Sequence, residues 1–353
     1  MSSDSSLKPL YEASTQFKNW RFSHARLNQI RSTLNEAAVS VIRTTFEAYE
    51  PGSSENVTFL TADEELLLVT FYSNMITQIC GRFRFPEEVE ATAATYLKRF
   101  YLKNTVMDWH PRNVMLTALF LATKTTNNPI SLEAYTSSIP KTSASDVLDL
   151  EFLVAQSLRF EFAVWHAHRA LWGIWLDVQS LPDAPPDFAA THSSIYETAL
   201  THVRASRFTD AELVYTPSQV ALAAFHLAAP DIAEKWLQSK EEKLPRPDSQ
   251  PPPNILASVK AIQDLITKFG HAPDVEAVRD VDRRLKLCKN PEKVVGSKAY
   301  LARKAEEEKK AEDKRTRKAN DAQKAINDND PFGDPLERPK PGLVDYDDDD
   351  DDD

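Results

Sequence analysis

The sequence predicts an all-α protein with two tandem helical bundles, flanking helices at both ends and a disordered acidic tail. Apolar residues recur at spacings of three and four, as in EELLLVTFYSNMITQI, EVEATAATYLKRFYL and ASDVLDLEFLVAQSLRF, which is the period of an amphipathic helix. The chain also repeats itself: with Pro111 placed on Pro217, HPRNVMLTALFLAT aligns without a gap with TPSQVALAAFHLAA. In both copies a proline precedes a segment that is apolar all round, which predicts a central helix buried on every side.

Five regions follow in chain order. An N-terminal extension with a flanking helix is expected over residues 1–55, the first bundle over 56–163 and the second over 164–270. A C-terminal helix is expected over 271–298, and a charged, largely disordered tail over 299–353.

Both flanking segments have an apolar face that needs a surface to cover it. In the N-terminal extension the aromatic residues are Phe17, Trp20 and Phe22. In the late helix the apolar residues recur with helical spacing, at Val278, Val281, Leu285 and Leu287. We therefore expect both segments to pack against the bundles.

Two segments lack the residues needed for a core. From Ala299 the chain continues as LARKAEEEKKAEDKRTRKANDAQKA, which is compatible with a solvated helix, and the residues after it are expected to be disordered. Between Lys235 and Asn254 the sequence SKEEKLPRPDSQPPP predicts a loop, because proline removes backbone donors and resists helix formation.

Composition excludes several function classes. The chain has 353 residues but only 7 glycines, and none of these lies close enough to another to form G-x-G-x-x-G, G-x-x-x-x-G-K or G-x-S-x-G. Loops that cradle nucleotides and nucleophile elbows are therefore excluded. The net charge is −11, but Asp345 and the run Asp347–Asp353 supply eight negative charges and leave about −3 for the rest. A basic surface for nucleic acid is not indicated.

The two cysteines, Cys80 and Cys288, exclude a disulfide framework or a cysteine-rich zinc site and suit a reducing compartment. No run of eighteen apolar residues exists, and MSSDSSLKPLYEAS lacks the order of a signal peptide. An intracellular, soluble chain is therefore expected.

The histidines and carboxylates of the sequence do not form a recognisable catalytic or metal-binding pattern. His166 and His168 lie in WHAHRALW, outside any H-E-x-x-H pattern, and are expected at a polar helix start. Asp149 and Glu151 have no histidine or lysine partner fixed by the sequence. His226 aligns with an apolar residue of the other copy, which favours a hydrogen-bonded core histidine. Neither catalysis nor a metal site is predicted.

The pair of bundles, with YLKRFYLKNTVMDWHPRNVMLTALFLATK in the first copy, resembles the cyclins over roughly residues 10 to 290. Within that family four segments resemble the cyclin H group: FKNWRFS, RFYLKNTVMDWHP, LVYTPSQVALAA and DVEAVRDVDRRLKLC. The resemblance implies two tandem cyclin boxes and a regulatory subunit of the CDK-activating kinase. That kinase phosphorylates CDK activation loops, also belongs to general transcription factor IIH, and phosphorylates the RNA polymerase II C-terminal domain.

The resemblance implies partners as well. These are a cyclin-dependent kinase of the CDK-activating type, a RING-finger assembly subunit and the core of general transcription factor IIH, in the nucleus. No direct nucleic-acid or membrane contact is implied, and no cofactor, because ATP and magnesium bind to the kinase. The aromatic N-terminal segment is expected to dock near the kinase side of the first bundle.

Five kinase-binding residues are carried over from the family by position. Lys124 matches the lysine that closes the central helix of the first box, and Glu151 matches the glutamate of its fifth helix; in the family this pair grips the mobile αC helix of the kinase. Ala155, Phe160 and Phe162 match further kinase-facing positions. The alternative explanations are a cation that complements a helix C-terminus at Lys124 and simple core packing for the phenylalanines.

The internal repeat favours the partner-facing explanation for Lys124, because Lys124 aligns with Pro230 and the duplicated scaffold needs no lysine there. Glu151 lies between Leu150 and Phe152 in an apolar stretch, where an unpaired carboxylate is costly. The chain departs from the family directly after Lys124, where TTNN replaces the usual acidic residues. Some kinase contacts are therefore expected to differ.

Three other functions stay open. A cyclin C-like or elongation-kinase cyclin shares the fold and differs in its kinase. A two-repeat transcription factor of the TFIIB type would need a basic face and a zinc ribbon, which Cys80 and Cys288 cannot supply. A helical scaffold without a kinase would purify without kinase activity.

Overall fold

The computed structural model describes residues 9–49, 51–182, 184–185, 187–241 and 255–327. Every regular element within these ranges is a helix, so the all-α prediction is confirmed. The chain divides into two units, Met1–Lys293 and Val294–Asp353. None of the helices in the described part of the chain has the length and apolar character needed to cross a bilayer.

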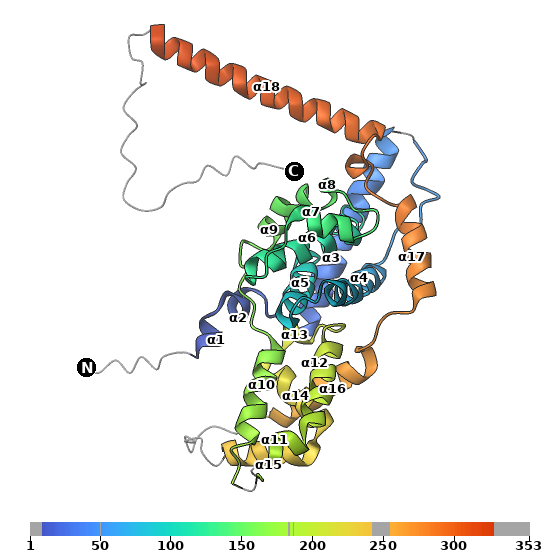
Figure 1. Ribbon diagram of the computed structural model, residues 1–353. Coiled ribbons are helices and arrows are strands. Elements are labelled where there is room, and N and C mark those ends of the chain that lie inside the picture. Colours follow the sequence, from blue (N-terminus) through green and yellow to red (C-terminus); the bar gives the residue numbers. More distant parts are fainter. Residues whose placement is uncertain (1–8, 50, 183, 186, 242–254, 328–353) are drawn as a thin grey trace, which may run out of the picture. The chain divides into compact units, whose positions relative to one another are not determined.

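The first bundle surrounds one central helix, α6 (Pro111–Thr125) (Figure 1). Pro111 is its first residue, and every residue from Val114 to Thr123 is buried, as the all-round apolar pattern predicts. The helices packed on it include α4 (Ala62–Phe83), α5 (Glu87–Phe100), α8 (Ser145–Leu148) and α9 (Glu151–Ser157); α7 (Leu132–Ser138) completes the bundle.

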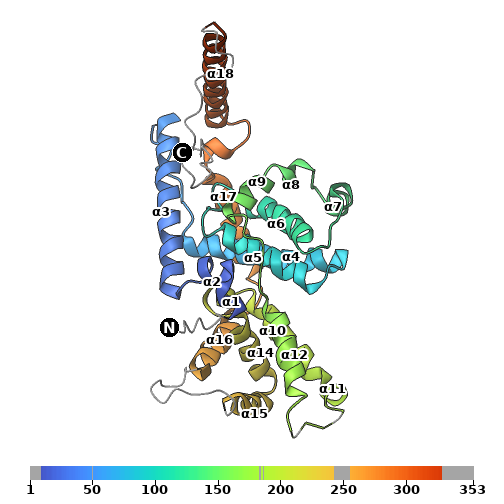
Figure 2. The same cartoon turned by 90° about the vertical axis from the view of Figure 1, so that its left-hand side faces the viewer.

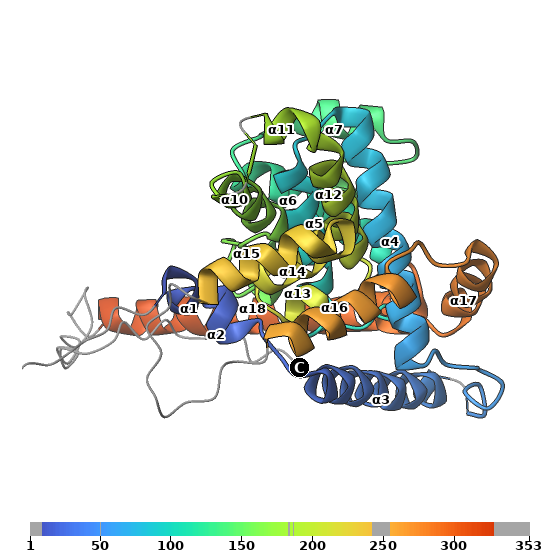
Figure 3. The same cartoon turned by 90° about the horizontal axis from the view of Figure 1, so that it is seen from below.

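The second bundle repeats this arrangement around α14 (Pro217–Ala228), which begins with Pro217. Figure 3 shows the helices that pack on α14, namely α10 (Ala167–Val178), α12 (Ser193–Ser206), α15 (Pro230–Glu241) and α16 (Ile255–Phe269). Two short helices, α11 (Phe188–Thr191) and α13 (Ala211–Val214), lie in its connections. The predicted duplication is thus confirmed. The predicted loop between Lys235 and Asn254 begins later than expected, because α15 continues to Glu241; residues 242–254 lie outside the described residues.

Charged side chains join the two bundles. Glu87 on α5 accepts hydrogen bonds from Arg204 (2.7 Å) and from Arg207, and Arg207 also reaches Glu90 at 2.8 Å. Burial works to raise the pKa of Glu87, but the two arginines outweigh it and lower that pKa to about 2. The junction therefore depends on mutual neutralisation of charge.

Buried histidines lie at the same junction. His166 Nε2 is 2.9 Å from Thr92 Oγ1 of α5, and its ring stacks on His168 at a centroid distance of 5.2 Å. Burial lowers the pKa of His166 well below its usual value, and burial together with Arg207 lowers the pKa of His168 to about 4. The two imidazoles are therefore held neutral at the junction.

The N-terminal extension forms α1 (Leu10–Ala13), α2 (Thr15–Asn19) and α3 (His24–Tyr49), and Figure 2 shows α3 running along the side of the first bundle. Arg31 of α3 pairs with Asp210 at 2.7 Å, which ties the extension to the second bundle.

The late helix α17 (Val275–Leu287), followed by the short turn η1 (Pro291–Lys293), packs on α4 of the first bundle. Val278, Val281 and Leu285 are buried in the core of that bundle, as expected. Leu287 is 71% exposed, so its predicted packing role is wrong; it lies two residues after Leu285 and therefore faces away from the core.

The second unit contains α18 (Lys298–Asn327). Residues 298–327 form a helix whose side chains from 304 to 320 are all exposed, which agrees with the solvated helix considered for the stretch from Ala299. Alternating lysine and glutamate at helical spacing support such a solvated helix without a core. The predicted disorder of residues 328–353 lies outside the described residues.

Candidate functional site

Two of the predicted site residues meet at the junction of α6 and α9. Lys124 lies in the last turn of α6, Glu151 is the first residue of α9, and Lys124 Nζ donates a hydrogen bond to Glu151 Oε1. Each charge also complements the dipole of its own helix, since the cation lies at a C-terminus and the anion at an N-terminus. The pair joins the end of the central helix to a surface helix.

This ion pair is open to solvent. The Lys124 side chain is 41% exposed and that of Glu151 26%, and Lys124 Nζ lies 4.5 Å from the centroid of the Phe120 ring. Exposed ion pairs contribute only ~0–1 kcal/mol to stability. The bundle therefore does not depend on this pair to fold.

The second bundle has no equivalent pair. Lys124 aligns with Pro230, which begins α15 directly after α14 has ended at Ala228. The second bundle therefore begins a new helix at the position where the first bundle has the charged Lys124.

The polar residues that replace the family's acidic residues after Lys124 end α6. Thr126 Oγ1 donates a hydrogen bond to Ala122 O at 2.7 Å, and Asn127 adopts a left-handed φ of 58°.

An apolar surface adjoins the ion pair. Ala155 is 8% exposed on α9, whereas Phe160, in the turn after α9, is 55% exposed. The Phe160 ring lies 6.3 Å from that of Phe162, which is half-buried against the first core. The five predicted residues therefore lie together at the end of α6, on α9 and in the turn after it, but Ala155 is buried and Phe162 is half-buried.

Sequence reasoning missed two exposed apolar residues here. Phe152 on α9 is 66% exposed with its ring 6.2 Å from that of Phe160, and Leu148, the last residue of the preceding helix α8, is 45% exposed. The available signal was that Phe152 directly follows Glu151 in the sequence. Exposed apolar residues grouped in this way mark an interaction site.

The N-terminal segment docks beside these phenylalanines. Asn19 Nδ2 and Trp20 Nε1 each donate to the carboxylate of Glu161 at 2.6 Å, and Trp20 is 2% exposed. The segment thus packs on the first bundle next to Phe160 and Phe162, and whether this is the side that faces a kinase stays a prediction.

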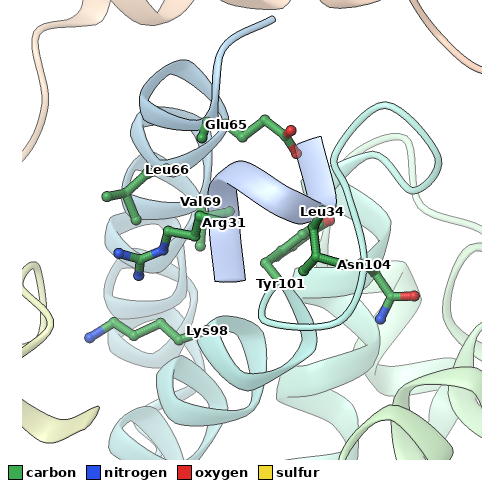
Figure 4. A pocket seen from close by; sticks show the side chains of 9 residues that line it. Arg31, Leu34, Glu65, Leu66, Val69, Lys98, Tyr101 and Asn104 are labelled. Carbon is green, nitrogen blue, oxygen red and sulfur yellow. The ribbon is translucent and has the colours of Figure 1, made fainter. Parts of the chain in front are cut away.

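A hollow lies between α3, α4 and α5 (Figure 4). Its basic side chains, Arg31 and Lys98, point to one side and pair with Asp210 and Glu212 of the second bundle at 2.7 and 2.8 Å. Its carboxylate, Glu65, accepts hydrogen bonds from Asn35, Thr105 and the amide of Val106. The charges of the hollow are thus engaged in holding the fold.

Within the described ranges, His, Cys, Asp and Glu side chains nowhere gather in threes that could hold a metal ion. His226 Nδ1 lies 3.0 Å from Gln263 Nε2, as expected of a hydrogen-bonded structural histidine.

Comparison with family models gives two matches. Residues 63–163 match the cyclin N-terminal domain, and residues 166–267 match the cyclin C-terminal domain. Together they cover the first and second bundles.

Individual relatives agree with these matches. Cyclin mcs2 of Schizosaccharomyces pombe is 30% identical over 328 residues, which cover 91% of this chain and 98% of that protein. A putative cyclin-H of Dictyostelium discoideum is 33% identical over 224 residues, which cover 62% of this chain and 75% of that protein.

Two solved structures resemble the fold. A chain in the CAK complex of Chaetomium thermophilum bound to ATP-γ-S is 29% identical, with a TM-score of 0.73 and coverage of 85% of this chain and 94% of that one. A chain in the yeast TFIIK (Kin28/Ccl1/Tfb3) complex is 26% identical, with a TM-score of 0.57 and coverage of 72% and 100%.

Proposed function

The chain belongs to the cyclin family, and on that premise we propose that it binds and activates a cyclin-dependent kinase of the CDK-activating type. Cyclins are regulatory subunits of kinase complexes. The relatives named cyclin-H, and the CAK and TFIIK complexes that contain similar chains, support this choice of kinase. The substrates would then be CDK activation loops and the RNA polymerase II C-terminal domain.

The main support from the structure is the surface formed by α6, α9 and the following turn. It combines a solvent-accessible ion pair, Lys124 with Glu151, and exposed apolar side chains such as Phe160. We assign kinase contact to Lys124, Glu151, Ala155, Phe160 and Phe162. A helix of the kinase would place its apolar face on the phenylalanines and its polar groups on the ion pair, since fully desolvated aromatic anchors dominate interface energetics.

The mechanism is a shift of the kinase population. A rigid surface that fits only the active position of a mobile helix binds that state more tightly, so it raises the active fraction in proportion to the difference in affinity. Active protein kinases require that this helix place its glutamate on the lysine that holds the ATP phosphates. The chain itself is therefore non-catalytic in this proposal, and ATP and magnesium bind in the kinase.

The further partners follow from the same proposal. A RING-finger assembly subunit and the core of general transcription factor IIH would join the complex in the nucleus, without direct nucleic-acid or membrane contact by this chain. The balanced charge outside the acidic run supports the lack of a nucleic-acid surface.

Purification of the tagged chain, with mass spectrometry of its partners and a kinase assay on a polymerase C-terminal domain peptide, tests the proposal. Phe160→Ala should weaken kinase binding and activation, because it truncates an exposed apolar anchor. Phe269→Ala is the matched control, since Phe269 is 50% exposed on α16 of the second bundle. Recovery of a cyclin C-type kinase would select the alternative cyclin; recovery of promoter DNA and polymerase without a kinase would select a TFIIB-like factor.

A further inference from the structure

The turn after α9 has a backbone conformation that its own residues disfavour. Arg159 and Phe160 have φ angles of 56° and 55°, in the left-handed region. Side chains with a Cβ atom crowd the following carbonyl there, so the region favours glycine. Such residues persist where the surroundings fix them, and they cluster at functional sites.

Three hydrogen bonds from neighbouring groups hold this turn in place. Phe160 N donates to Ala155 O at 2.9 Å and Glu161 N to Leu158 O at 3.0 Å, and Tyr96 Oη donates to Phe162 O at 2.7 Å. These hydrogen bonds end α9 and attach the turn to α5. None of them involves the side chain of Glu161.

The N-terminal segment supplies the remaining contacts. Both carboxylate oxygens of Glu161 are engaged at 2.6 Å, Oε1 by Asn19 Nδ2 and Oε2 by Trp20 Nε1. The Trp20 ring in turn lies 4.8 Å from the guanidinium of Arg99, a side chain only 1% exposed, which also donates to Glu161 O at 3.4 Å. Hydrogen bonds to a charged acceptor in a buried place are the strong ones.

We infer that Asn19 and Trp20 are positioning residues: by holding Glu161 they set the strained turn that presents Phe160 and Phe162, before any kinase is bound. This inference rests on the proposed function, in which those phenylalanines contact the kinase. A surface already in its bound conformation does not lose binding free energy to ordering. The N-terminal segment would thus affect the affinity for the kinase through the turn that it holds.

The test uses the full chain with Asn19→Ala and Trp20→Phe, singly and combined; the phenylalanine keeps a smaller aromatic ring at this buried position and removes the Nε1 donor. The matched control is Gln16→Ala, which removes two hydrogen bonds from the same segment, both to the backbone of Trp165. The double variant should bind the kinase about tenfold more weakly, with a slower association rate, and the control within about twofold. Amide exchange at Phe160 and Glu161 in the free chain should speed up in the double variant alone.

Arg159→Gly, added to the double variant, should recover a large part of the affinity, because glycine adopts the left-handed region without strain. If the double variant does not fold, Trp20→Phe alone gives the same comparison with the smaller change. Equal affinity and equal exchange in variant and control would overturn the inference. Phe160→Ala separates the two proposals: normal binding by that variant refutes the kinase surface itself, whereas weak binding by it together with normal binding by the double variant refutes only the positioning role.

Discussion

Truncation of Lys124 or Glu151 to alanine should separate the stability of the free chain from its affinity for the kinase. In the free chain each residue takes part in an exposed ion pair, complements a helix terminus, and, for Lys124, faces the Phe120 ring at 4.5 Å. Contributions of this kind are worth ~0.2–1 kcal/mol each and overlap, so either truncation should lower the free energy of unfolding by about 1 kcal/mol or less.

The same truncations should reduce the affinity for the kinase by more than they reduce the stability of the free chain. A kinase helix laid over a pair that is 41% and 26% exposed would remove it from water, and loss of one partner from a desolvated, hydrogen-bonded charge pair costs ~2–5 kcal/mol of binding. That is a fall in affinity of roughly 30-fold or more. Since the two residues contact each other, the double variant should lose less than the sum of the single losses.

Urea unfolding of the free chain and calorimetric titration with the kinase measure the two quantities for both single variants and the double variant. Lys260→Ala is the control, because Lys260 forms an exposed ion pair with Asp264 at 2.9 Å on α16. Equal losses of stability and binding would show that the pair is structural. Normal binding by the double variant would remove it from the interface.

Three further outcomes are expected. Arg207→Ala should lower the free energy of unfolding by about 3 kcal/mol, because it removes the arginine from the half-buried Glu90 and leaves Glu87 with Arg204 alone; a loss under ~1 kcal/mol in urea unfolding would show that the junction does not need the Arg207 charge. Stability should fall as the pH is lowered from about 6.5 towards 4, by up to ~1.4 kcal/mol per pH unit for each of His166 and His168, since the unfolded chain takes up protons that the buried imidazoles refuse. His168→Gln should flatten that profile, and an unchanged slope would contradict the assignment. Removal of residues 305–353 should change the free energy of unfolding of the first unit by less than ~0.5 kcal/mol, measured by thermal unfolding, because the side chains of α18 described beyond that point are exposed; a clear drop in melting temperature would count against it.

The architecture was predictable because helical periodicity and duplication are properties of the residue order. Pro111 and Pro217 do begin the two central helices, as their alignment predicts. The ends of exposed helices were harder to place: α15 runs into the segment expected to be a loop, since the polar residues before the prolines are themselves good helix formers.

The candidate site was predictable only in part. The family resemblance identified Lys124 and Glu151, and the structure brings them together. The hydrogen bonds from Asn19 and Trp20 to Glu161 were not predictable, because these residues are far apart in the sequence. The left-handed backbone of the turn between α9 and α10 was not predictable either, because the turn contains no glycine.

The position of α17 has a consequence for how the protein is made. Val278, Val281 and Leu285 complete the core of the first bundle, yet they follow the whole second bundle in the chain. During synthesis, which adds residues from the N-terminus onward, the face of α4 that α17 covers stays exposed until the second bundle has emerged from the ribosome. Contacts between residues so far apart in the chain raise the contact order and slow folding. A chain cut short before residue 278 would therefore lack these three core residues of the first bundle, although it contains the whole of the second.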